Sequence, residues 1–218
     1  MDPLEPVRFI KHGCVCFEHE DAVIYVDPFG ISDEANDADL IIITHSHSDH
    51  YSPADIRRVC KDDTCFVTTA DVARLLERDF GVDDDYISVV SFESPRLGFE
   101  CGAMVQPVAA ENKNHPVGFG FGVVLKFAGF TYYLSGDTDI LADNVRCDVL
   151  FAVCDGLYNM PGYETRIPEQ VRAMDECPGL VVPYHYGMME GTKENGAKLC
   201  AALEAAGIPC REWHKGLF

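Results

Sequence analysis

Three histidines and an aspartate fall within six residues of this sequence, at His45, His47, Asp49 and His50. Imidazole and carboxylate groups together are the usual ligands of zinc, manganese and iron. On a regular strand, residues two apart share a face, so His45 and His47 could bind one ion. Asp49 and His50 would then point towards a neighbouring position. A solvated histidine-rich loop is the alternative, but this spacing favours a metal site.

A buried strand must position this cluster, and the β-branched run Leu40–Ile43 provides one directly before it. Another predicted strand, 22–26, ends in the turn Asp27-Pro28-Phe29-Gly30. Further strands are predicted over 7–11, 14–17, 104–109, 121–127, 131–134, 149–153, 180–182 and 208–213. Helices are predicted over 53–60, 71–79, 168–176 (with Pro168 in its first turn) and 193–206. This order predicts helices packed outside two sheets, with the site residues where strands end.

The length and composition indicate one compact domain spanning residues 1–218. No apolar run approaches the roughly 20 residues of a membrane span, and the N-terminus lacks the basic and hydrophobic regions of a secretory signal. We therefore expect a cytoplasmic protein that does not associate with membranes. The ten cysteines are irregularly spaced, and in a cytoplasmic protein we expect them to be reduced thiols.

The net charge of −19 argues against a nucleic-acid partner, because acidic chains repel phosphate backbones. The seventeen lysines and arginines are scattered and form no basic stripe. We expect a small-molecule substrate instead.

Three motifs, in order, resemble those of the metallo-β-lactamase superfamily. Thr44-His45-Ser46-His47-Ser48-Asp49-His50 matches its T-H-x-H-x-D-H signature, Ser135-Gly136-Asp137-Thr138-Asp139 is similar to its G-D-T segment, and Pro183-Tyr184-His185-Tyr186-Gly187 is similar to its P-x-H-Y-G segment. The opening residues, Lys11-His12-Gly13-Cys14 and Tyr25-Val26-Asp27-Pro28, resemble a branch that contains ascorbate-6-phosphate lactonase-like proteins and uncharacterised metal-dependent hydrolases. The resemblance implies an α/β fold of the four-layer αββα sandwich type.

The resemblance also implies a ligand set for one or two divalent ions, with zinc favoured and manganese or iron as alternatives. His45, His47 and His115 would hold one ion, Asp49, His50 and His185 the other, and Asp137 would bridge them. His115 is the only candidate for the histidine expected between the first motif and G-D-T, and its alternative role is to contact substrate. Asp49, His50 and Asp137 are the residues we expect to act in catalysis.

Weaker candidates surround this set. His12 and Asp27 could orient ligands, or could be an ordinary core histidine and a turn aspartate. Tyr184 or Tyr186 could donate a hydrogen bond to a developing oxyanion, or could simply pack. Lys113 and Arg166 could recognise an anionic group, or be surface charges. His19 and His214 are expected on the surface, and the loop Asp155–Tyr163 is expected to select the substrate.

The function implied is hydrolysis by a metal-bound hydroxide of a small anionic ester, lactone or phosphodiester. Three alternatives remain at this point: a nuclease of the same superfamily, a mononuclear iron dioxygenase, and a non-catalytic metal-binding protein. The absence of a basic stripe argues against the nuclease. Metal analysis is needed to exclude the dioxygenase. The intact ligand set argues against the non-catalytic metal-binding protein without excluding it.

Overall fold

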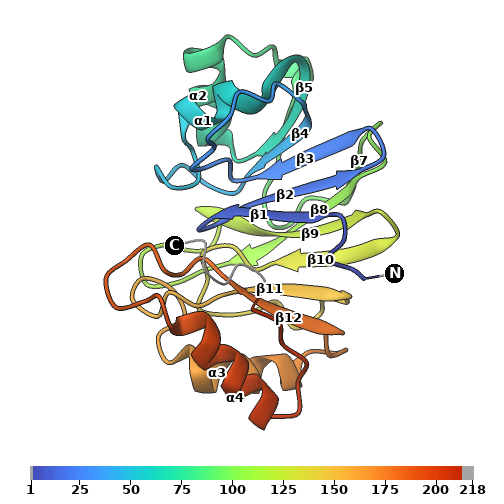
Figure 1. Cartoon of the computed structure of the whole chain (residues 1–218). Coiled ribbons are helices and arrows are strands. Elements are labelled where there is room, and N and C mark those ends of the chain that lie inside the picture. The colour runs from blue at the N-terminus through green and yellow to red at the C-terminus, as the bar shows by residue number, and fades with distance from the viewer. Residues whose placement is uncertain (1, 213–218) are drawn as a thin grey trace.

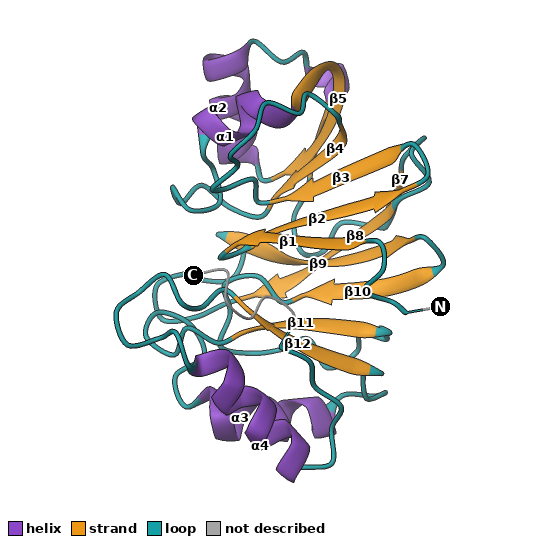
Figure 2. Ribbon diagram, viewed as in Figure 1, coloured by secondary structure: helices purple, strands orange, loops and turns teal. Residues whose placement is uncertain are grey.

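The chain folds into four layers, as the computed structural model of residues 2–212 shows (Figure 1). Two six-stranded sheets pack face to face, and two helices cover the outer face of each sheet (Figure 2). This arrangement is the predicted αββα sandwich, which is thereby confirmed. Within the described residues, no helix is both long and apolar enough to span a bilayer.

The first sheet follows the chain order. Its strands are β1 (Val7–Lys11), β2 (Cys14–His19), β3 (Ala22–Val26), β4 (Ala38–Ile43), β5 (Cys60–Thr68) and β6 (Ile87–Val89). The first three pair antiparallel and β3 to β6 pair parallel. Parallel neighbours need a crossover, which α1 (Pro53–Val59) supplies between β4 and β5. Between β5 and β6, α2 (Ala70–Phe80) and a short 3₁₀ helix, η1 (Asp84–Tyr86), supply another, and a loop over residues 27–37 connects β3 to β4.

The second sheet has the order β12-β11-β10-β9-β8-β7. Its strands are β7 (Leu97–Gly98), β8 (Met104–Ala110), β9 (Gly120–Phe127), β10 (Phe130–Leu134), β11 (Val149–Val153) and β12 (Leu180–Tyr184). β7 to β10 pair antiparallel, whereas β10, β11 and β12 are parallel. α3 (Tyr163–Ala173) connects β11 to β12, and α4 (Asn195–Ala205) follows β12. The carboxyl ends of the parallel strands in both sheets meet at one edge of the sandwich, where the candidate site lies.

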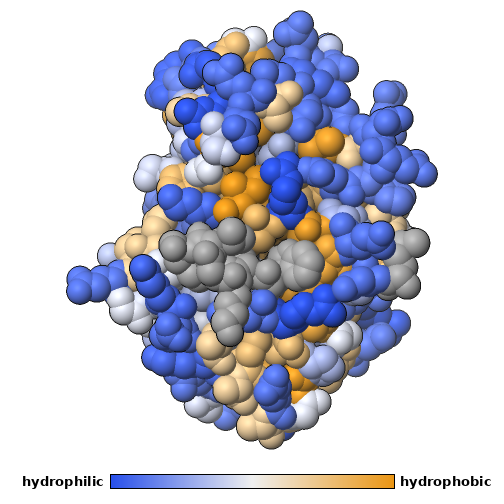
Figure 3. Space-filling view, in the orientation of Figure 1, coloured by the Kyte–Doolittle hydropathy of each residue, from blue (hydrophilic) through white to orange (hydrophobic). Residues whose placement is uncertain are grey.

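The alternation of side chains along β4 explains how this strand packs against the second sheet on one face and against helices on the other. Leu40 and Ile42 pack into the apolar cluster between the sheets, while Ile41 and Ile43 pack beneath α1 and α2. Both faces are covered, so the strand is apolar throughout. On the surface drawn in Figure 3, hydrophobic side chains appear near the middle and over part of the α3–α4 end, and hydrophilic ones cover most of the α1–α2 end.

Some sequence predictions about elements were wrong. The helix predicted from residue 168 begins at Tyr163, after Gly162 with a left-handed φ of 73°, and Pro168 lies inside it. A proline inside a helix removes one hydrogen bond, here to the carbonyl of exposed Glu164. Strands β5, β6 and β7 were not predicted. The expected strand 208–213 is reduced, as far as it is described, to a bridge between Cys210 and Val181, and Trp213 lies outside the described residues.

The expectation that all cysteines are reduced is also contradicted. Cys200, in α4, and Cys210, beyond it, form a disulfide with their Cα atoms 5.3 Å apart. The spacing along the sequence did not predict this pair. The chain reverses at Gly207, just after α4, and this brings position 210 beside the helix. The other eight cysteines are free, among them the buried Cys14, Cys16 and Cys154.

Candidate metal centre

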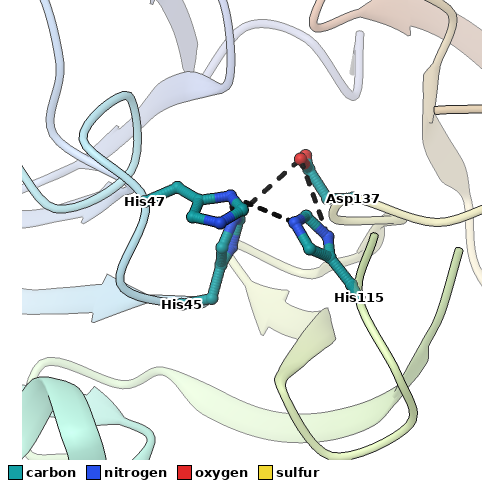
Figure 4. A group of neighbouring side chains, drawn as sticks. All are labelled: His45, His47, His115 and Asp137. Carbon is teal, nitrogen blue, oxygen red and sulfur yellow. Dashed lines mark hydrogen bonds and ion pairs between the residues drawn. The ribbon is translucent and has the colours of Figure 1, made fainter. Parts of the chain in front are cut away.

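The first half of the site joins His45, His47, His115 and Asp137 (Figure 4). Nε2 of His45 and Nε2 of His115 lie 3.2 and 3.0 Å from Nδ1 of His47. Oδ2 of Asp137 lies 3.9 Å from His45 Nε2 and 4.0 Å from His115 Nδ1. Since β4 ends at Ile43, the regular strand spacing we assumed for His45 and His47 does not hold. Both residues lie beyond the strand, and a tight turn begins at His47, whose carbonyl accepts from the amides of His50 and Tyr51.

The second half joins His50, His185 and Asp49 to the other oxygen of Asp137. His50 Nε2 and His185 Nε2 are 3.1 Å apart and lie 3.4 and 3.0 Å from Asp137 Oδ1. Asp49 Oδ2 lies 3.9 Å from His50 Nε2 and 4.0 Å from His185 Nε2. All seven predicted ligands are therefore close together. The two oxygens of the Asp137 carboxylate face different halves of the site: Oδ2 faces the first and Oδ1 the second.

Strands from the parallel parts of both sheets carry most of these groups at their carboxyl ends, whereas His115 lies in the loop between β8 and β9. Asp27 follows β3, the histidine cluster follows β4, Asp137 follows β10, Asp155 follows β11, and His185 follows β12. Because carboxyl ends of parallel strands lie side by side, residues far apart in the sequence meet here. The sequence placed most of these residues at strand ends but could not show which ends become neighbours.

A side-chain network fixes the loop that carries His115. Oδ1 of Asn112 accepts hydrogen bonds from the backbone amides of Asn114 (2.7 Å) and His115 (2.9 Å). Nδ2 of Asn112 donates to the Asp137 carbonyl at 3.3 Å. The asparagine thus holds the His115 loop against the segment that carries the shared aspartate. Its role was not predicted, although an Asn three residues before a candidate ligand is a recognisable turn signal.

Two buried carboxylates lie behind the second half of the site. Asp27 accepts from the Thr44 amide and hydroxyl, both at 2.8 Å, and its Oδ2 is 2.7 Å from His50 Nδ1. Asp155 Oδ2 lies 3.4 Å from His185 Nδ1. Such carboxylates orient a ligating imidazole and raise its basicity. Asp27 had been considered for this role, whereas Asp155 had only been placed in a substrate loop. Its position after a buried strand, like that of Asp27 and Asp137, was the available signal.

The charges of the site are strongly coupled. Burial alone would raise the pKa of Asp137, but the imidazoles of His185 and His50 hold it well below its usual value. Burial likewise opposes protonation of His185, yet Asp137 and Asp155 raise its pKa to about 9. The pKa of His50 is raised well above its usual value, against burial, by Asp137 and Asp27. Burial and the neighbouring His50 lower the pKa of His45, which is neutral at neutral pH. Without a cation, protons on His50 and His185 balance the carboxylates.

The backbone around the second half is strained. His12, Asp27 and His185 have left-handed φ angles of 56°, 48° and 57°, a region that costs energy for residues other than glycine. The His185 amide donates to the His12 carbonyl at 3.0 Å, and the two rings lie with centroids 3.6 Å apart. A Cβ on Gly13 would stand 3.2 Å from His185 Cδ2 and 3.3 Å from His50 Cε1. A side chain at position 13 would therefore press on both imidazoles, which glycine avoids.

The residues present fit divalent metal ions. Oδ1 of the buried Asp137 lies at hydrogen-bond distance from His185 Nε2 but outside hydrogen-bond geometry, so it has no hydrogen-bond partner within the described chain. A buried carboxylate oxygen that faces several imidazole nitrogens without a hydrogen-bond partner is typical of a ligand aimed at a cation. The donor set of imidazoles and carboxylates suits zinc, manganese or iron.

A cavity of about 330 Å³ opens onto these groups. Five predicted ligands line it, His47, Asp49, His115, Asp137 and His185, together with His12, Asn114, Asp155, Tyr158, Asn159 and Met189. The loop 155–163 therefore does reach the site, through Asp155, Tyr158 and Asn159. The volume suits a small molecule.

Several weaker candidates lie elsewhere. The Tyr184 hydroxyl accepts from the Gly136 amide at 2.7 Å, and the Tyr186 hydroxyl donates to Glu212 Oε1 at 3.0 Å; neither residue lines the cavity. Lys113 Nζ donates to the Leu157 carbonyl and Arg166 Nη2 to the Asp139 carbonyl, and they do not line it either. His19 is exposed, and His214 lies outside the described residues.

Comparison with known proteins identifies the family. A model described as a beta-lactamase superfamily domain matches residues 6–185, so the chain belongs to this superfamily, as the motifs predicted. The matched region ends at the last predicted ligand, His185.

Relatives agree with this assignment. A metal-dependent hydrolase of Thermococcus kodakarensis is 27% identical over 200 residues, covering 83% of this chain and 84% of that protein. One of Thermus thermophilus is 26% identical over 217 residues, covering 93% and 92%. A crystal structure from Parabacteroides distasonis, of a protein proposed to be a metal-dependent hydrolase, has 28% identity and a TM-score of 0.76, and the match covers 94% of this chain and 90% of that one. The predicted enzyme class is the one for which these relatives are named.

Proposed function

We propose that this protein is a hydrolase of small molecules that works with two divalent ions, His45, His47 and His115 holding one, Asp49, His50 and His185 the other, and Asp137 shared between them. The observation that carries the proposal is the position of Asp137, whose two carboxylate oxygens face two separate groups of imidazoles at the floor of one cavity. Zinc is the favoured metal, since the donors are mainly imidazoles; manganese and iron suit the same set.

Divalent ions in such a site supply Lewis acidity and make water a nucleophile at neutral pH. The chain's own contribution is to hold the ligands in place. Asp27 orients His50, Asp155 lies behind His185, and Asn112 fixes the loop of His115. Five of the seven ligands, His45, His50, His115, Asp137 and His185, are buried, and burial strengthens the electrostatic interactions among them.

The substrate is proposed to be a small ester, lactone or phosphodiester, with no nucleic-acid partner. A cavity of about 330 Å³ and a net charge of −19 support a small ligand over a polyanion. The expected anionic character of the substrate finds no support in the positions of Lys113 and Arg166, which both donate to backbone carbonyls away from the cavity wall.

The test combines metal analysis with a substrate panel. Protein purified without chelator should carry one to two equivalents of zinc, manganese or iron, and should hydrolyse at least one member of a panel of carboxylic esters, lactones and phosphodiesters. Asp137→Asn should lose both tight metal binding and turnover. Metal-free wild-type protein after reconstitution with each metal would refute the metal site. Bound iron with oxygen consumption, and no hydrolysis, would favour an oxygenase instead.

A further inference from the structure

The wall of the cavity gives information about the substrate that the ligands do not. Apart from histidines and aspartates, it consists of Asn114, Tyr158, Asn159 and Met189. The amide of Asn159 is already bonded, since its Oδ1 accepts from Asn112 and its Nδ2 donates to Asp155. The phenol ring of Tyr158 and the thioether of Met189 are the two apolar side chains of the wall.

No lysine or arginine lines the cavity within the described chain. Two basic side chains near the cavity form other hydrogen bonds. Lys113 donates to the Leu157 carbonyl at 3.3 Å, and Arg166, in α3, donates to the Asp139 carbonyl at 2.9 Å. Proteins that recognise carboxylate or phosphate groups usually present a guanidinium or ammonium group to them. The described wall presents none.

The ions themselves leave little positive charge for an anionic substrate. The carboxylates of Asp49, Asp137 and Asp155 all line the cavity, and three negative charges oppose the four positive charges of two divalent ions. The rest of the chain adds a strongly negative background, with a net charge of −19. A neutral substrate avoids the repulsion that an anion meets on approach.

Exposed apolar side chains lie on the loops that form the cavity wall. Leu157 and Tyr158 are 50% and 55% exposed, and Val117 and Met188 are also exposed. Each lies in a loop that supplies a cavity residue: Val117 follows His115, and Met188 precedes Met189. Half of the eight large hydrophobic side chains that are exposed in the described structure thus lie on these three loops. Exposed apolar side chains gathered at one place mark a binding surface.

We infer that the substrate is a neutral carboxylic ester or lactone whose hydrocarbon group packs against Tyr158 and Met189. This inference rests on the proposed function. In the reaction one water is consumed: the acyl C–O bond breaks, the acyl carbon gains the water's hydroxyl group, and the leaving oxygen takes the remaining proton.

A matched set of p-nitrophenyl esters tests the inference on the metal-loaded protein. The hexanoate and the mono-adipate have the same chain length but differ in a terminal methyl or carboxylate, and the acetate lacks the chain. We expect kcat/KM at least tenfold higher for the hexanoate than for the acetate, because each buried methylene favours binding about three- to fourfold. We also expect it at least tenfold higher than for the adipate. Equal or faster turnover of the adipate, or of bis-p-nitrophenyl phosphate, would overturn the neutral substrate while leaving the hydrolase intact.

Substitutions of Tyr158 and Met189 test whether these residues cause the preference for the longer acyl chain. Tyr158→Ala and Met189→Ala should each lower kcat/KM for the hexanoate more than for the acetate. The matched control is Tyr86→Ala, since Tyr86 is similarly exposed (41%) but lies in η1, at the other end of the fold from the cavity loops. An unchanged hexanoate-to-acetate ratio in both cavity variants would show that the hydrocarbon does not bind there.

Binding of the unreactive amide N-butylhexanamide, followed by ligand-observed NMR, separates this inference from the proposed function. Binding that is lost in Tyr158→Ala, without hydrolysis of any ester, would reject the hydrolase but support an apolar pocket. Neither binding of the amide nor a chain-length preference would reject the pocket, whether or not the protein hydrolyses other substrates.

Discussion

Nε2 of His12 lies 3.3 Å from Oδ2 of Asp49, and His12 is only 2% exposed. Neither ring nitrogen of His12 forms a hydrogen bond of acceptable geometry within the described chain. Burial and the neighbouring His185 lower the pKa of His12 to about 4, so the ring is neutral at neutral pH. A buried neutral imidazole beside a ligand carboxylate is well placed to hold that carboxylate towards an ion.

The variant His12→Asn tests this role. Asparagine tolerates the left-handed backbone at this position better than alanine does, but its side chain is too short to reach Asp49. We expect the affinity for the ion near His50 and His185 to fall about 10- to 100-fold, with the ion near His45 retained. Competition with a chromophoric chelator would measure the two constants. If the dissociation constants of both ions are unchanged, His12 contributes to packing and does not orient Asp49.

Ligand variants should affect the two halves separately. His115→Ala should lose about one metal equivalent from the His45–His47 half, and His185→Ala should lose about one from the other half. Elemental analysis of dialysed protein gives the stoichiometry. If His115→Ala keeps its full metal content and only KM rises, the residue contacts substrate, which is the alternative role considered for it from the sequence.

Metal binding should release protons in a pH-dependent way. In the metal-free protein, carboxylates raise the pKa of His185 to about 9 and that of His50 well above its usual value, despite burial. Both imidazoles are then protonated at pH 7 and must lose their protons to bind metal. We expect up to two protons released per protein at pH 7, fewer as the pH rises through about 9. Titration calorimetry in buffers of different ionisation enthalpy measures this number. A value near zero at pH 7 would contradict the raised pKa values of His50 and His185.

The same raised pKa values predict how metal-free stability depends on pH. The stabilisation from protonated His50 and His185 is fully present below about pH 6.5, their unfolded pKa. The part from His185 is lost as the pH rises through about 9, and the part from His50 is lost above its own raised pKa. The melting temperature of metal-free protein should therefore fall across this interval. Metal at a hundredfold excess over its dissociation constant should add roughly 2.7 kcal/mol and remove most of this fall. Thermal melts with and without chelator, with metal content checked, would show both effects.

The disulfide can be tested by itself. Closing a loop of ten residues between Cys200 and Cys210 should stabilise the oxidised protein by roughly 2–3 kcal/mol through the entropy of the unfolded chain. Cys200→Ser should lose that amount in urea unfolding, and Cys177→Ser, at an exposed free cysteine, is the control. Equal stability of wild type and Cys200→Ser under oxidising conditions would contradict a formed bond.

The sequence predicted the strand β4 and the ligands after it because a buried apolar run and a dense ligand motif are both local signals. It could not predict β5, whose first half, Cys60–Asp63, is polar and partly exposed and resembles a loop. It also missed Asp155, since the approach of that carboxylate to His185 depends on β11 and β12 being neighbours. The predicted start of α3 is misplaced because Pro168 was interpreted as a first-turn residue, whereas Gly162, six residues earlier, is the boundary.

The order in which the ligands occur along the chain has a consequence for biosynthesis. The histidine cluster leaves the ribosome early with β4, but Asp137 follows only after β10, and His185 only after β12. Until the second sheet has docked on the first, a nascent chain can offer an ion no more than an incomplete set of donors. Tight metal capture should therefore come late in synthesis, and a ribosome-bound chain stalled before β12 should exchange its ion much faster than the released protein.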